Sequence, residues 1–362
     1  MHDHEKALDY VLGDDLPEPS RAIAVAPGIK WVRMGLPFAL NHVNLWLVRD
    51  ELPDARGQTV QGWTVIDCCI DAPAARAQWQ TLFVRELEGL PIIRVLVTHM
   101  HPDHVGLAHW LCERWRAPLF MSATDYACAR LGTLQAISGA GGDAAADFFA
   151  AHGLTDPQAV AKIRQRTDYY RQMVPAVPPR FSRLLDGDTL ALGHGGARDD
   201  WRQISGYGHA PEHIALYSPR RNILIAGDMV LPRISTNVSV YDSEPDADAL
   251  RLFLSSLDKF RALPADTLVL PSHGKPFKGL HTRIDQLHQH HRERLAEVLA
   301  VCRQAPRSAA DVLDVLFRRP LDAHQITFAM GESIAHLNWL MHQGQVRRVR
   351  EDDGVYRFSA TA

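Results

Sequence analysis

The chain has 362 residues, 46% of them apolar and 22% charged, with a formal net charge of −3 at pH 7. This composition is typical of a soluble globular protein, and the small net charge argues against a polyanion binder driven by bulk charge. The length favours one large domain with a smaller one attached.

The chain carries no signal for export or membrane insertion. No apolar run is long enough to span a bilayer, and the polar N-terminus MHDHEKALDY lacks the apolar core of a signal peptide. The five cysteines include no CxxC pair, which is typical of a reduced, cytoplasmic protein.

The first third of the chain predicts strands that alternate with helices. Two short strands are expected within 31–48 around a turn at Gly35 and Pro37, and a loop is expected at 51–62. There follow a strand WTVID (63–67), a helix (73–88), a buried strand IIRVLV (92–97), an amphipathic helix (105–115) and a strand PLFMS (118–122).

Residues 123–178 interrupt this alternation with helical patterns, which we interpret as a helical insertion that forms a lid. Strand patterns then return in DTLAL, WRQISGYG, HIALYSP, NILIAGD and DTLVLPSHG. Strands and helices alternate on both sides of the insertion, so we expect an α/β fold whose sheets are covered by helices.

The end of the chain predicts a smaller unit. A polar linker helix is expected at 281–304, with His291 on a solvated face. Residues 305–362 then predict a helix (306–319), a second helix (328–344) with a glycine cap, and a hairpin (345–360) that turns at DDG. Helix, helix and two-stranded wing are the outline of a winged-helix-like domain.

The segment THMHPDH (98–104) places three histidines and an aspartate directly after a predicted strand. Alternate side chains of an extended loop point the same way, so His99 and His101 can hold one ion while Asp103 and His104 hold a second. Imidazole and carboxylate are ligands that Zn²⁺ accepts.

Three more apolar runs end in a ligand-type residue with glycine alongside, namely at His209, Asp228 and His273. The alternative is a chance cluster of polar loop residues. The chain has 19 histidines, so some can lie near one another without a function. A chance HxHxDH motif is much rarer than a single histidine at a strand end, so we favour a metal site.

Together these motifs resemble the metallo-β-lactamase-fold hydrolase superfamily. The resemblance rests on THMHPDH, on GHAPEH (208–213), on AGDMV (226–230) and on PSHG (271–274), and it spans about 20–280. It implies an αββα sandwich with helices outside two mixed sheets. It also implies that His99, His101 and His209 bind a first metal, that Asp103, His104 and His273 bind a second, and that Asp228 bridges them.

By the same resemblance, two divalent ions, Zn²⁺ or alternatively Fe or Mn, activate a shared water that attacks a carbonyl or phosphorus centre. Asp103 and Asp228 then serve as the catalytic carboxylates. Asp67 is expected either to accept a proton from a ligand imidazole or to cap the turn before Cys68.

The subgroup is less defined than the superfamily. Glyoxalase II shares the ligands but has a GHEYT-like sequence where this chain reads HGKPFKG. Closer in layout are lactamase-like proteins with a C-terminal winged-helix segment, which include thioesterases and a single-strand-specific endoribonuclease. We expect hydrolysis of an acyl-CoA or acylglutathione thioester or a related ester. The alternatives are an endoribonuclease or phosphodiesterase acting on single-stranded RNA, a lactonase, and a sensor without turnover.

Candidate substrate contacts are Tyr207, Lys275 and Lys278, near the metal motifs. The pairs at 148–149 and 169–170 either line an acyl pocket or belong to the core. Residues 281–362 hold 11 arginines and no lysine against 10 acidic residues, which argues against nucleic-acid binding. We therefore expect a small-molecule acyl substrate and no membrane, with a tail that closes over the metals or makes a homodimer contact.

Overall fold

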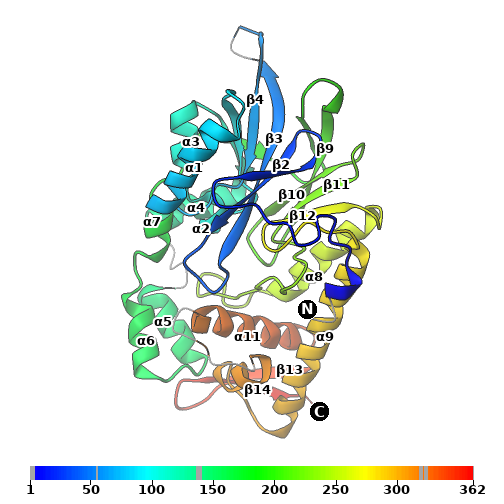
Figure 1. The fold of residues 1–362 in the computed structure, drawn as a ribbon. Helices are drawn as coiled ribbons and strands as arrows, with labels where there is room; N and C mark the ends of the chain where they lie inside the picture. Colours follow the sequence, from blue (N-terminus) through cyan, green and yellow to red (C-terminus); the bar gives the residue numbers. More distant parts are fainter. Residues whose placement is uncertain (1–4, 54–55, 136–140, 318–320, 322–324, 362) are drawn as a thin grey trace.

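Two β-sheets face each other at the centre of the molecule, with helices on both outer sides (Figure 1). The computed structural model describes residues 5–53, 56–135, 141–317, 321 and 325–361. This arrangement is the αββα sandwich expected from the sequence.

The larger sheet follows chain order, because each strand pairs with the next. Its strands are β1 (Ala22–Ala26), β2 (Ile29–Gly35), β3 (His42–Pro53), β4 (Thr59–Ile66), β5 (Ile92–Leu96), β6 (Leu119–Ser122) and β7 (Ser182–Leu184). The loop expected at 51–62 is shorter than predicted, because β3 and β4 stay paired as far as Pro53 and Thr59.

The smaller sheet has the order β12-β11-β10-β9-β8. Its strands are β8 (Thr189–Leu192), β9 (Asp199–Gly206), β10 (His213–Ser218), β11 (Ile223–Gly227) and β12 (Leu268–Pro271). Buried side chains from both sheets form one apolar cluster between them, including Trp31 and Trp46 from the larger sheet and Trp201 and Ile225 from the smaller. Burial of this surface holds the two sheets face to face.

Helices cover the outer faces. On the larger sheet lie α1 (Pro73–Arg85), α2 (Pro102–Val105) and α3 (Ala108–Trp115), and α8 (Ala249–Lys259) packs on the smaller sheet. The insertion is helical as predicted, with α4 (Ala123–Thr133), α5 (Gly142–Ala151), α6 (Pro157–Gln165) and α7 (Tyr169–Met173). Single 3₁₀ turns are η1 (Glu5–Ala7), η2 (Gly195–Ala197) and η3 (Phe260–Ala262).

The C-terminal part contains α9 (Leu280–Gln304), η4 (Ala310–Val312), α10 (Leu313–Leu316), α11 (Gln325–His342) and the hairpin β13 (Val346–Arg350) to β14 (Tyr356–Ala360). The hairpin and the α11 glycine cap, Gly344 at φ +69°, agree with prediction. The helix predicted at 306–319 is shorter in the structure: Ala310–Leu316 is helical, but Arg307 exchanges two backbone hydrogen bonds with Phe358 and so cannot be helical. Residues 318 and 319 lie outside the described residues. The winged-helix assignment stays a prediction.

The insertion and the C-terminal part share one core, although they are far apart in sequence. Phe149 of α5 and Ile163 of α6 belong to the same buried cluster as Ile334 of α11 and Phe358 of β14. Figure 1 shows α5 and α6 beside one end of α11. The solvated position predicted for His291 is wrong, because this residue is fully buried on the face of α9 that packs against α11.

Among the described residues, no helix combines the length and hydropathy needed to cross a bilayer. The cytoplasmic location and the homodimer contact stay predictions.

Candidate metal centre

Four strand ends bring the predicted ligands to one edge of the sandwich. β9 and β11 are both antiparallel to β10, and β12 is parallel to β11, so β9, β11 and β12 end at the same edge. His209, Asp228 and His273 each follow one of these ends within three residues. The backbone of Ile214 donates to Thr98 O at 2.8 Å, which joins the end of β5 to this edge.

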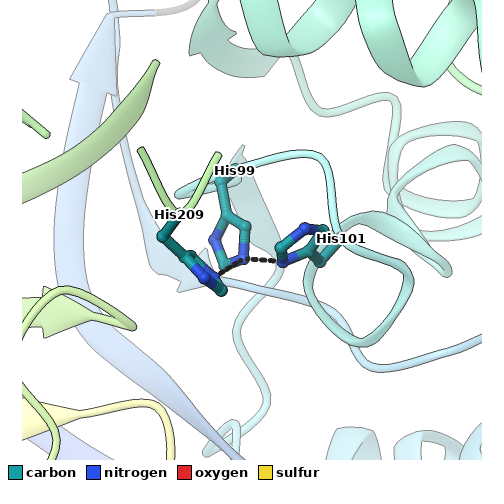
Figure 2. Close-up of side chains that lie close together, drawn as sticks. All are labelled: His99, His101 and His209. Carbon is teal, nitrogen blue, oxygen red and sulfur yellow. Dashed lines mark hydrogen bonds between the residues drawn. The ribbon is translucent and has the colours of Figure 1, made fainter. Parts of the chain in front are cut away.

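Three imidazoles form the first group (Figure 2). His99 Nε2 lies 2.9 Å from His101 Nδ1 and 3.3 Å from His209 Nε2. Their ligand atoms all lie within 4.8 Å of one another. Three ring nitrogens that converge in this way can hold one divalent ion.

Asp103, His104 and His273 form a second group with the same property. Asp103 Oδ2 lies 3.4 Å from His104 Nε2 and 3.5 Å from His273 Nε2. Asp103 and His104 belong to α2, a single turn that begins at Pro102. The fixed φ of this proline suits the first position of a helix. From this turn the two side chains reach the same point, where Asp103 Oδ2 and His104 Nε2 meet.

Asp228 lies between the two groups. Its Oδ2 is 3.3 Å from His209 Nε2, and its Oδ1 is 3.6 Å from His104 Nε2 and 3.4 Å from His273 Nε2. One carboxylate therefore faces both groups, which is the geometry expected of a bridging ligand.

Hydrogen bonds on the outer side of the rings direct their Nε2 atoms inward. His104 Nδ1 lies 2.8 Å from Asp67 Oδ2, and His209 Nδ1 lies 2.7 Å from Asn237 O. His273 Nδ1 lies 2.7 Å from His42 O. Such partners fix the tautomer of a metal-binding histidine. The expectation that Asp67 accepts from a ligand imidazole is confirmed.

The donor set fits divalent cations. His104 Nε2, His273 Nε2 and Asp228 Oδ1 are buried and have no hydrogen-bond partner among the described residues. Burial alone lowers the pKa of His104, but nearby carboxylates led by Asp103 reverse this and hold that pKa well above its ordinary value. Buried carboxylate and imidazole atoms without partners are groups that divalent cations would satisfy.

Two supporting residues were missed by sequence reasoning. His213 is buried, and its Nε2 accepts a hydrogen bond from the backbone N–H of Asp228 at 3.1 Å. Asp125, on the first turn of α4, accepts from the backbone N–H of Met100 at 2.7 Å and from that of Glu212 at 2.5 Å. It thereby joins the loop of His99 and His101 to the loop after His209. No motif marks Asp125, because its partners are backbone atoms distant in sequence.

The predicted substrate contacts lie in varied surroundings. The Lys275 ammonium lies 2.7 Å from Asp14 Oδ1 and 2.8 Å from Gly13 O, so it is held by the N-terminal segment. The Lys278 backbone pairs with Asp9. Tyr207 is partly buried, and Lys259 lies over its ring at 5.6 Å. Their roles as substrate contacts stay predictions.

The aromatic pairs divide between core and partly buried positions. Phe149 and Tyr170 are buried in the core, whereas Phe148 and Tyr169 pack at its margin. Tyr170 donates from its hydroxyl to Met100 O at 2.6 Å, so α7 is attached to the loop of His99 and His101.

Comparison with known proteins agrees with this geometry. Residues 41–273 match the family model described as the metallo-beta-lactamase superfamily. The chain belongs to the metallo-β-lactamase superfamily. Residues 295–361 match a second model, the C-terminal domain of metallo-beta-lactamase-like proteins. Members of this superfamily bind divalent metals, and membership places the chain among the metallo-hydrolases.

Similar members extend over nearly the whole chain. A beta-lactamase domain protein from Burkholderia ambifaria is 51% identical, with a TM-score of 0.91 and 99% of each chain covered. A metallo-beta-lactamase family protein from Thermus thermophilus is 27% identical, with a TM-score of 0.75, covering 93% of this chain and 100% of the other. The probable metallo-hydrolase YqjP of Bacillus subtilis is 24% identical over 90% of this chain and 96% of its own.

Proposed function

We propose that the protein is a dinuclear metal-dependent hydrolase of thioesters or related acyl esters. The supporting observation is that Asp228 faces two groups of converging ligands, one led by His99 and the other by Asp103. Two bound divalent ions, Zn²⁺ or alternatively Fe or Mn, would lower the pKa of a water molecule held between them and polarise the substrate carbonyl.

The chain's own residues supply orientation and proton handling. Asp103 is partly exposed, with 18% of its side chain accessible, whereas the His104 side chain is fully buried. In the proposed mechanism Asp103 is thus the carboxylate that meets solvent and substrate, and it orients the attacking water. Asp228 is only 9% exposed and fixes the spacing of the two groups.

The insertion places one aromatic residue near this centre. Burial raises the pKa of the Tyr169 phenol, on α7, to about 12. The nearby Asp103 carboxylate contributes to this rise, so Tyr169 lies close to Asp103. Arg166, just before α7, reaches Thr327 on α11 at 3.4 Å. We propose that the aromatic side chain of Tyr169 meets the acyl part of the substrate, as in an acyl-CoA or acylglutathione type of ligand.

The charges of the C-terminal hairpin argue against the RNA alternative. The Arg348 guanidinium lies 2.7 Å from Asp246, and that of Arg357 lies 2.6 Å from Asp353. Nucleic-acid binders present a basic face that is open to phosphates. Pairing of these two arginines weakens the positive potential that a nucleic acid would meet on the hairpin, which supports the thioester proposal over an endoribonuclease.

The test is a panel of acyl-CoA and acylglutathione thioesters, with a lactone and labelled single-stranded RNA in parallel, using protein loaded with Zn²⁺, Mn²⁺ or Fe²⁺. We expect thioester turnover that stops after chelation and in the variant His101→Ala, which removes one ligand of the first group. His342→Ala is the matched control, because it removes an exposed histidine that lies 2.9 Å from Asp246 O and belongs to neither ligand group, and it should retain turnover.

RNA cleavage without thioester turnover would overturn the proposed substrate class while leaving the metal centre intact. Turnover that persists equally in His101→Ala and after chelation would overturn the metal-dependent mechanism itself.

A further inference from the structure

A short segment between β11 and α8 lies against two of the candidate ligands, Asp228 and His209. Thr236 Oγ1 donates to the backbone carbonyl of Asp228. Asn237 O accepts from His209 Nδ1 at 2.7 Å. The position of Asn237 therefore decides how the His209 imidazole is turned toward His99.

The same segment is attached to α11, in the C-terminal part of the chain. Asn237 Nδ2 donates to Glu332 Oε2 at 3.1 Å, and Ser239 Oγ donates to Asn237 Oδ1 at 2.7 Å. The amide of Asn237 is thus held at both ends, which fixes its backbone as well as its side chain. The Val240 N–H also donates to Gly331 O at 3.1 Å.

Helix α11 comes unusually close to this segment. A Cβ atom added at Gly331 would lie 2.7 Å from Ser239 Cβ, so only glycine allows the approach. Glu332 follows Gly331 directly and is partly buried. Burial raises the pKa of Glu332 to about 7, although the Asn237 amide opposes the rise by favouring the carboxylate.

We propose that Glu332 is a positioning residue for the first metal site, acting through Asn237 on His209, and that the C-terminal part is therefore needed to complete the metal centre. This inference rests on the metal centre proposed above, but it does not depend on the substrate. It assigns to α11 a role inside the catalytic site that the family ligands alone do not require.

The test is metal affinity, measured by competition with a chromophoric chelator and by the visible absorption of the Co²⁺-substituted protein. Removal of a partner outside the ligand set typically lowers metal affinity 10–100-fold. In Glu332→Ala we expect one of two ions to bind at least tenfold more weakly, with a changed Co²⁺ spectrum. Glu332→Gln keeps an acceptor for the Asn237 amide and should restore most of the affinity.

Asn338→Ala is the matched control on the same helix. Asn338 Nδ2 donates to Pro245 O at 3.0 Å and to Ala247 O at 3.1 Å, so its loss loosens α11 without touching Asn237. This variant should lose thermal stability but keep the affinity and the Co²⁺ spectrum of the parent protein.

Equal metal affinity in Glu332→Ala and Asn338→Ala would overturn the proposal. If Glu332→Ala does not fold, Asn237→Ala takes its place, because it keeps the carbonyl that faces His209 and removes both side-chain restraints. Unchanged affinity in that variant would also overturn it. Because binding is measured without substrate, failure here is separate from failure of the proposed thioesterase activity.

Discussion

The hydrogen bond from Tyr170 to the metal-binding loop gives a sharp prediction. Met100, whose carbonyl accepts this bond at 2.6 Å, lies between His99 and His101. Burial raises the pKa of Tyr170 well above its ordinary value, so the phenol remains a donor throughout the neutral range. Tyr170→Phe removes the donor and keeps the ring that packs against Gly132.

The expected cost follows from what the substitution leaves behind. The Met100 carbonyl loses a short hydrogen bond in a partly buried place, and an unsatisfied buried acceptor costs about 1–3 kcal/mol. If the displaced loop raises the activation free energy by about 1–2 kcal/mol, kcat/KM decreases roughly 5- to 30-fold, since about 1.4 kcal/mol corresponds to a factor of ten.

A matched control exists in the same insertion. Tyr126 donates from its hydroxyl to Pro178 O at 2.9 Å, on a segment that carries no metal ligand. Tyr126→Phe therefore removes a bond of the same kind. The assay compares urea unfolding of the metal-free proteins, Zn²⁺ affinity, and steady-state thioester kinetics for both variants.

We expect a similar loss of unfolding free energy in the two variants, but weaker metal binding and lower kcat/KM only in Tyr170→Phe. If Tyr126→Phe impairs metal binding and turnover as much as Tyr170→Phe does, the attachment of α7 to the loop has no specific role, and the reasoning is refuted.

Two further predictions concern charge. Asp67→Asn leaves one amide oxygen for both the Thr98 N–H and the His104 ring, so the second metal should bind about 10–100-fold more weakly; full occupancy by elemental analysis after dialysis would contradict this. His152 is buried, and burial lowers its pKa to about 4. Below its ordinary pKa this histidine binds a proton more readily in the unfolded chain than in the folded one. The contribution of His152 to the free energy of unfolding is therefore complete above pH 6.5 and falls by up to about 3 kcal/mol as the pH decreases to 4. In metal-free protein, the free energy of unfolding measured with urea should therefore decrease more steeply with falling pH in the parent chain than in His152→Gln. An equal dependence on pH in the two proteins would contradict this prediction.

The clustering of the candidate metal ligands could be predicted from sequence because each of them depends on a local signal. An apolar run followed by one polar residue and a glycine marks a strand end, and the sandwich brings such ends to one edge. Asp67 could be predicted for the same reason, since it follows the strand WTVID. These residues lie where hydrophobic periodicity stops, and periodicity is the clearest signal that a single sequence carries.

The supporting contacts could not be predicted, because they join segments with no common pattern. The Asn237–Glu332 and Tyr170–Met100 bonds span 95 and 70 positions, and one partner in the second is a backbone atom. The errors have a similar origin. His291 belongs to a polar run, but tertiary packing against His336 on α11 overrides the local pattern.

The core shared by the insertion and the C-terminal part has a consequence for synthesis of the chain. Phe149 and Ile163 share a buried cluster with Ile334 and Phe358, which leave the ribosome much later. At about 5–20 residues per second, roughly 10–40 s separate the appearance of Phe149 from that of Ile334. During this interval the cluster lacks its members from α11 and β14, so premature release or truncation before α11 leaves apolar surface that favours aggregation or chaperone binding.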